Sequence, residues 1–76
     1  MTQYRVALTL ERSLDEQEIQ KLREQRGESI SDYEMDGDNV VLAILNAADS
    51  LTARDTAEVQ VSRATGVAIQ SAQLIP

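Results

Sequence analysis

The chain of 76 residues contains no cysteine, no histidine, no tryptophan and no phenylalanine. Without cysteine it forms no disulfide and offers no thiolate to a metal or to a substrate. Without histidine it lacks the commonest general base and metal ligand. Thirteen acidic residues outnumber seven basic ones, and the net charge of -6 opposes binding to a phosphate backbone. The sequence therefore predicts no cofactor, no metal site and no nucleic-acid binding.

Long apolar runs are also absent. No stretch reaches the roughly 20 apolar residues of a membrane helix, and the N-terminus lacks a basic segment followed by an apolar run. We therefore expect no membrane segment and a cytoplasmic location. The apolar fraction of 42% and its regular spacing predict one folded domain over residues 1–76.

The N-terminal part of the sequence, residues 4–27, predicts a strand followed by a helix. Residues 4–10 alternate between apolar and polar side chains, as a half-buried strand does. Ser13 and Glu16 match a capping box and predict a helix over residues 14–26. Gly27 is placed to end this helix.

Two further strands are expected at residues 29–35 and 39–46, joined by the turn signal Asp36-Gly37-Asp38. A second helix follows, with Gly66 at its end, and residues 67–75 predict a closing strand. The candidate N-caps of this second helix are Asp49, Ser50 and Thr52. The apolar face of this second helix consists of small residues, namely Ala53, Ala57, Val61 and Ala64.

The order βαββαβ in so short a chain predicts an α+β fold, the ferredoxin-like sandwich. Four antiparallel strands in the order 4-1-3-2 form one sheet, and two helices cover one of its faces. The other face is left open to a partner.

The residues on that open face depend on the length of the central turn. With an even number of turn residues, Tyr33, Met35, Val40, Leu42 and Ile44 face the helices; a three-residue turn reverses one arm of the hairpin. We adopt the even number. The predicted interface on the open face then consists of Ala7, Thr9, Val41, Ala43, Leu45, Ala68 and Ala72. A contiguous apolar strip on a small domain favours an interface over a free surface, most simply with a second copy.

The negative charge is concentrated near the hairpin. Residues 28–58 contain eight acidic side chains and one arginine. The alternating carboxylates of Asp32, Glu34, Asp36 and Asp38 predict an acidic patch. Such a patch either docks a basic protein or keeps an edge strand soluble. A calcium loop is excluded because Ala43 stands where the loop needs its last glutamate.

Catalytic motifs are missing. The three glycines are isolated, so there is no phosphate-binding loop, and no serine lies in a nucleophile elbow. RNA-recognition motifs stack bases on aromatic residues of the two central strands, but the expected outward positions there are Ala7, Thr9, Val41 and Ala43. We therefore expect a non-catalytic protein-binding or regulatory module, a homodimer or the partner of another protein, comparable by analogy to small phage-encoded inhibitors. The alternative is an ACT-like regulatory domain that binds a small molecule at a dimer interface.

Overall fold

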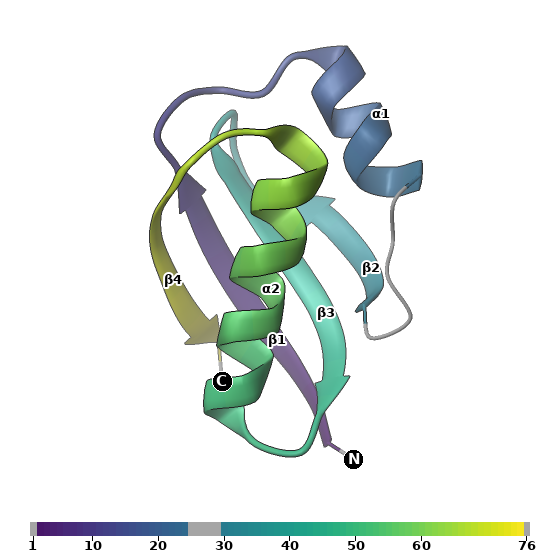
Figure 1. Cartoon of the computed structure of the whole chain (residues 1–76), viewed down its shortest axis with the longest axis vertical. Helices are drawn as coiled ribbons and strands as arrows, with labels where there is room; N and C mark the ends of the chain where they lie inside the picture. The colour runs from purple at the N-terminus through teal and green to yellow at the C-terminus, as the bar shows by residue number, and fades with distance from the viewer. Residues whose placement is uncertain (1, 25–29, 76) are drawn as a thin grey trace.

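The computed structural model describes residues 2–24 and 30–75 and contains four strands and two helices (Figure 1). Their order along the chain is strand, helix, strand, strand, helix, strand. The elements are β1 (Thr2–Leu10), α1 (Glu16–Glu24), β2 (Ile30–Met35), β3 (Val40–Ala47), α2 (Ser50–Thr65) and β4 (Ile69–Ile75). The predicted strands and helices are therefore present. The expected end of the first helix at Gly27 lies outside the described residues.

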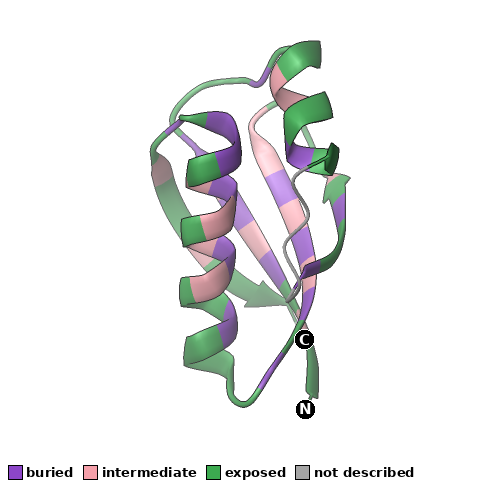
Figure 2. Cartoon of the chain, turned by 45° about the vertical axis from the view of Figure 1, so that its right-hand side comes forward, coloured by how far each residue is buried: buried purple, intermediate pink, exposed green. Residues whose placement is uncertain are grey.

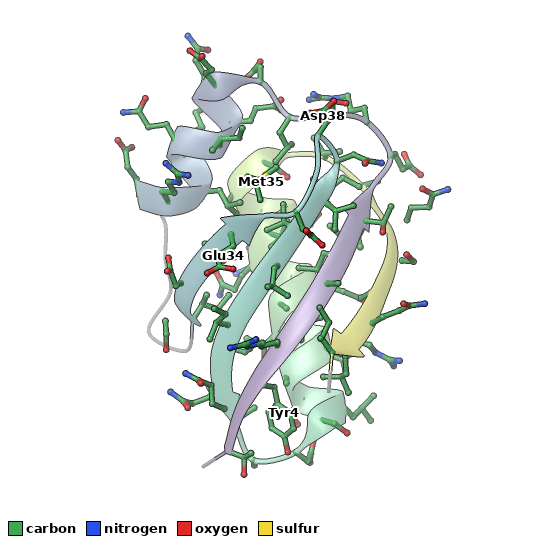
Figure 3. The ribbon with its side chains drawn as sticks, turned by 180° about the vertical axis from the view of Figure 1, so that it is seen from behind. Tyr4, Glu34, Met35 and Asp38 are labelled. Atoms are coloured by element: carbon green, nitrogen blue, oxygen red, sulfur yellow. The ribbon has the colours of Figure 1, made fainter. Side chains whose placement is uncertain are left out.

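All neighbouring strands are antiparallel, and the strand order is β2-β3-β1-β4. The same neighbours read as 4-1-3-2 when the sheet is followed from the β4 edge. Both helices lie on one side of this sheet, and the other side has no helix over it in the described part of the chain (Figures 1 and 3). The α+β class is confirmed.

The core lies between the sheet and α2. Its largest fully buried side chains include Leu8 and Leu10 of β1, Leu45 of β3 and Leu22 of α1. The helix α2 contributes a buried stripe of small side chains, which Figure 2 shows as the purple side facing the sheet. As predicted, this stripe contains Ala53, Ala57, Val61 and Ala64. Small side chains allow the helix axis to approach the sheet closely.

The two helices begin at different kinds of cap. Asp49 caps α2 by accepting a hydrogen bond from the Thr52 N–H at 2.8 Å, and Gly66 ends it at φ 70°. At α1 the predicted capping box is displaced by two residues. Asp15 accepts from the Glu18 N–H at 2.8 Å, and the Glu18 carboxylate accepts from the Asp15 N–H at 3.1 Å. The box that forms therefore has an aspartate as its cap instead of the predicted serine.

The central hairpin differs from the prediction in the length of its turn. The Asp36 N–H donates to the Val40 carbonyl at 2.9 Å, which leaves three residues, 37–39, between the paired positions. Gly37 adopts φ 144°, a conformation that other residues rarely adopt. An odd number of turn residues reverses one arm of the hairpin relative to an even number. The reversed arm is β3.

This reversal corrects the predicted faces of β3. Val41, Ala43 and Leu45 are 0% exposed and belong to the core, so their predicted placement on the open face is wrong. They pair with Leu8, Val6 and Tyr4 of β1, whose side chains were correctly expected to face the helices. The opposite face of β3 carries three half-buried residues, Val40, Leu42 and Ile44, and their predicted place in the core is wrong as well.

Candidate protein-binding surface

The open face of the sheet has an apolar centre. Val40, Leu42 and Ile44 of β3 lie there beside the half-buried Ala7 and Thr9 of β1. Leu42 pairs with Ala7, and Val40 pairs with Thr9. Backbone pairing directs such side chains to the same face, at a separation of about 5 Å. Of the predicted interface residues, Ala7 and Thr9 are therefore placed on this face as expected.

The two predicted interface residues near β4 lie elsewhere. Ala72 pairs with Leu8 and packs against the core, so its predicted place on the open face is wrong. Ala68 precedes β4, is exposed, and lines a shallow hollow beside α2. The open face of β4 instead carries Ser71, Gln73 and Ile75, as their pairing with β1 shows.

Val40, Leu42 and Ile44 are the residues that sequence reasoning missed. The signal was the turn itself, since Asp-Gly-Asp-Asn is compatible with a three-residue loop that has glycine at its unusual position. All three are large aliphatic residues, and they stand on a strand that is apolar on both faces. Such a strand is normally covered on both faces. Here only the helix side is covered within the described chain.

The predicted acidic patch is divided between a face and a turn. Asp32 and Glu34 lie on β2 on the open face, where Asp32 pairs with Ile44 and Glu34 pairs with Leu42. Asp36 and Asp38 belong to the turn, and the Asp38 carbonyl accepts the Leu14 N–H at 3.1 Å. All four residues are exposed. Figure 3, which views the molecule from the open face, shows Glu34 along β2 and Asp38 at the tip of the hairpin.

The apolar and acidic residues consequently form rows across the sheet. One row runs through Glu34, Leu42, Ala7 and Gln73, and the next through Asp32, Ile44, Arg5 and Ile75. Each row changes from a carboxylate on β2 to an aliphatic side chain on β3. We call this surface the acidic–apolar face, and it consists of Asp32, Glu34, Val40, Leu42, Ile44, Ala7 and Thr9.

The charged groups with displaced pKa values lie at helix starts, away from the acidic–apolar face. Arg12 forms a two-pronged ion pair with Glu18 and also donates to the Ser13 carbonyl at 3.1 Å. The hydrogen bonds that Glu18 accepts from Arg12 and from the Asp15 N–H lower the pKa of Glu18 to about 2. The pKa of Asp49 is lowered as well, chiefly by the hydrogen bond from the Thr52 N–H. Each shift therefore has a cause in the capping of a helix.

Tyr33 also has a displaced pKa, and it belongs to the core. Its side chain is 5% exposed, and burial raises the pKa of its phenol to about 12. Within the described residues its hydroxyl has no hydrogen-bond partner. Because Tyr33 pairs with Ala43 on the helix side of the sheet, it does not reach the acidic–apolar face.

Residues 2–24 and 30–75 contain no group of three or more acidic, histidine or cysteine side chains able to hold a metal ion. In the same residues, no helix combines the length and the apolar character required to cross a membrane. The hollows on the surface are shallow and lie along the outer sides of the two helices.

Comparison with known proteins gives no relative. No protein-family model, no curated protein and no solved structure matches this chain.

Proposed function

We propose that this chain is a ferredoxin-like, non-catalytic protein-binding module whose acidic–apolar face docks a partner protein. The observation that carries the proposal is the pairing of Glu34 with Leu42 and of Asp32 with Ile44. This register sets a row of carboxylates directly beside a row of aliphatic side chains. A partner with apolar side chains at its centre and basic side chains at one rim would complement both rows.

The apolar row supplies the affinity in this proposal. Leu42 and Ile44 are half-buried by their neighbours, and no helix lies over them within the described chain. Covering them would remove apolar surface from water, at about 25 cal/mol per Å². The carboxylates would act mainly on orientation and on the rate of association.

The charge on this face favours a different protein over a second copy. A copy packed face to face would bring two rows of carboxylates from Asp32 and Glu34 onto one interface, with Arg5 as the only basic residue named in the rows. Like charges at an interface oppose association. We therefore no longer expect the chain to associate with a second copy through this face.

Two observations support a binding role over a catalytic one. The lowered pKa of Glu18 is explained first by its hydrogen bonds from Arg12, the lowered pKa of Asp49 by its helix cap, and the raised pKa of Tyr33 by its burial in the core. The acidic–apolar face itself is a sheet surface, whereas catalytic sites usually lie in clefts that exclude water.

The test is affinity capture from a native extract of the source organism with the natural chain and three variants. Leu42→Glu and Glu34→Lys should each lose the captured protein, and capture should weaken as salt is raised. Val59→Glu, an exposed position on α2, is the matched control and should retain it. Capture that is unaffected by Leu42→Glu and Glu34→Lys would contradict the proposal.

A further inference from the structure

The two edges of the sheet differ in chemical character. β2 forms one edge and contains Asp32 and Glu34, whereas β4 forms the other and has no charged residue and no proline from Ile69 to Ile75 (Figure 1). Natural proteins protect edge strands with charge, proline or bulges, because an open edge pairs readily with another strand. β4 has one irregularity, which lies at its first residues, and Ser71–Ile75 then pair with β1 in continuous register.

The exposed apolar side chains gather at the same edge. Among the described residues, four large apolar side chains are classed as exposed, and all four lie on α2 or β4. They are Leu51 at 59%, Val59 at 48%, Leu74 at 39% and Ile75 at 38%. Single exposed apolar residues need no explanation, but four of them on one helix and its neighbouring edge strand favour an interface at this edge. Leu74 lies on the helix side of β4 and Ile75 on its open side.

The outer side of α2 is hollowed around Val59. One hollow lies between α2 and the start of β4, where Val59 and Ile69 form part of the wall. A second hollow on α2 lies between Asp55 and Val59. Val59 borders both shallow hollows and, by the helical spacing, lies on the side of α2 opposite the buried stripe, so this outer side stays exposed.

The charge along this edge balances. α2 carries two acidic and two basic side chains, Asp55 and Glu58 with Arg54 and Arg63, and β4 carries none. The surplus of six negative charges therefore lies entirely outside α2 and β4. For a chain with this net charge, the edge formed by α2 and β4 is a surface on which a second copy meets little net repulsion.

We propose that two copies of this chain form a twofold dimer through β4, each β4 pairing antiparallel with the other. A twofold axis normal to the sheet makes two identical edge strands antiparallel and keeps both α2 helices on the same side. The result is a continuous eight-stranded sheet. The backbone groups of β4 that point away from β1 find partners in the other β4, as in recognition by strand addition.

The same axis brings the two α2 helices side by side. They run antiparallel on one face of the joined sheet, and their net charge of zero creates no repulsion between them. The exposed Leu74, which pairs with Val6 on the helix side of β4, is then covered. This dimer goes beyond the proposed function, because it leaves the acidic–apolar face of each copy open to a partner protein.

The first test is the absolute mass by light scattering over a range of concentrations. We expect the mass to rise from 8.4 kDa to twice that value. Leu74→Glu, on β4 itself, should weaken the dimer at least about tenfold, a loss typical of a charge placed in an interface core. Leu42→Glu, on the acidic–apolar face, is the matched control and should leave the dimer unchanged. Circular dichroism and thermal unfolding verify that each variant is folded.

The second test follows the strand pairing itself and does not depend on a variant. Hydrogen exchange should show that the amides of Gln70–Leu74 exchange more slowly at concentrations where the dimer forms.

Three outcomes would overturn the proposal. The first is a natural chain that keeps the mass of one copy at every concentration, and the second is a dimer in which the exchange of the β4 amides does not change with concentration. The third is a dimer that tolerates Leu74→Glu but is lost with Leu42→Glu, since it would assign self-association to the acidic–apolar face. That third result would leave the capture experiment above as the separate test of partner binding.

Discussion

The backbone N–H of Asp36 lies 2.9 Å from the carbonyl oxygen of Val40, and this contact closes the turn between β2 and β3. It sets the pairing that follows, in which Met35 lies opposite Val41 and Tyr33 lies opposite Ala43. Every side chain of β3 takes its face from this register. The turn is also tied to β1 and the loop after it, because the Asn39 carbonyl accepts the Leu10 N–H at 2.8 Å.

Two leucines of the same strand test this register. Leu45 is 0% exposed in the core, and Leu42 is half-buried on the acidic–apolar face. Leu45→Ala should lower the free energy of unfolding by about 2–5 kcal/mol, since it removes buried methylene groups and leaves a cavity. Leu42→Ala should cost less than about 1.5 kcal/mol, because less apolar surface returns to water. Urea unfolding measures both, and equal losses would contradict the register.

The hairpin also shows where sequence reasoning succeeded and where it failed. The strands, the helices, the Asp49 cap and the small-residue face of α2 follow from local periodicity and capping chemistry, which adjacent residues determine. The faces of β3 follow from the number of turn residues, and Asp36-Gly37-Asp38-Asn39 permits more than one number. A change of one residue exchanges the core and surface sets. Because β3 is apolar on both faces, its own pattern did not reveal the error.

The candidate surface was predicted in parts but not as a whole. Ala7, Thr9, Asp32 and Glu34 were placed on the open face from alternation along their own strands, and the structure places them there. That Glu34 lies beside Leu42 depends on the pairing between β2 and β3. Alternation within one strand does not determine this pairing. The sequence therefore showed an acidic row and an apolar strip without showing that they adjoin.

The start of α1 provides a second matched pair. Asp15 caps this helix by accepting from the Glu18 N–H, whereas Ser13 stood at the predicted cap two residues earlier. Asp15→Ala should lower the free energy of unfolding by about 0.5–2 kcal/mol. Ser13→Ala should change it by no more than about 0.5 kcal/mol, as is usual for a surface substitution. If Ser13→Ala is the more damaging variant, the cap lies at Ser13 and the described start of α1 is wrong.

The hydroxyl of Tyr33 predicts a substitution that does not destabilise. Its oxygen is buried without a hydrogen-bond partner among the described residues, so the folded state bears the cost of removing it from water. Tyr33→Phe keeps the ring in the core and should leave the free energy of unfolding unchanged or raise it by up to about 1 kcal/mol. Tyr33→Ala should lower it by about 3–5 kcal/mol, as for other buried aromatic residues. A loss above about 1 kcal/mol in Tyr33→Phe would show that the hydroxyl has a partner.

The ion pair between Arg12 and Glu18 predicts how stability depends on pH. The pKa of Glu18 is about 2 in the folded chain, whereas an unfolded glutamate has a pKa of about 4.3. A carboxyl group with a lower pKa in the folded state stabilises it above the unfolded value, and this stabilisation is lost as the pH falls toward the folded value. The urea midpoint should therefore fall between about pH 4.3 and pH 2. Glu18→Gln and Arg12→Gln should each flatten this part of the profile, and Glu16→Gln, on the exposed side of the same first turn, should leave it as in the natural chain. If Glu18→Gln retains the full acid dependence, the loss of stability comes from other carboxylates.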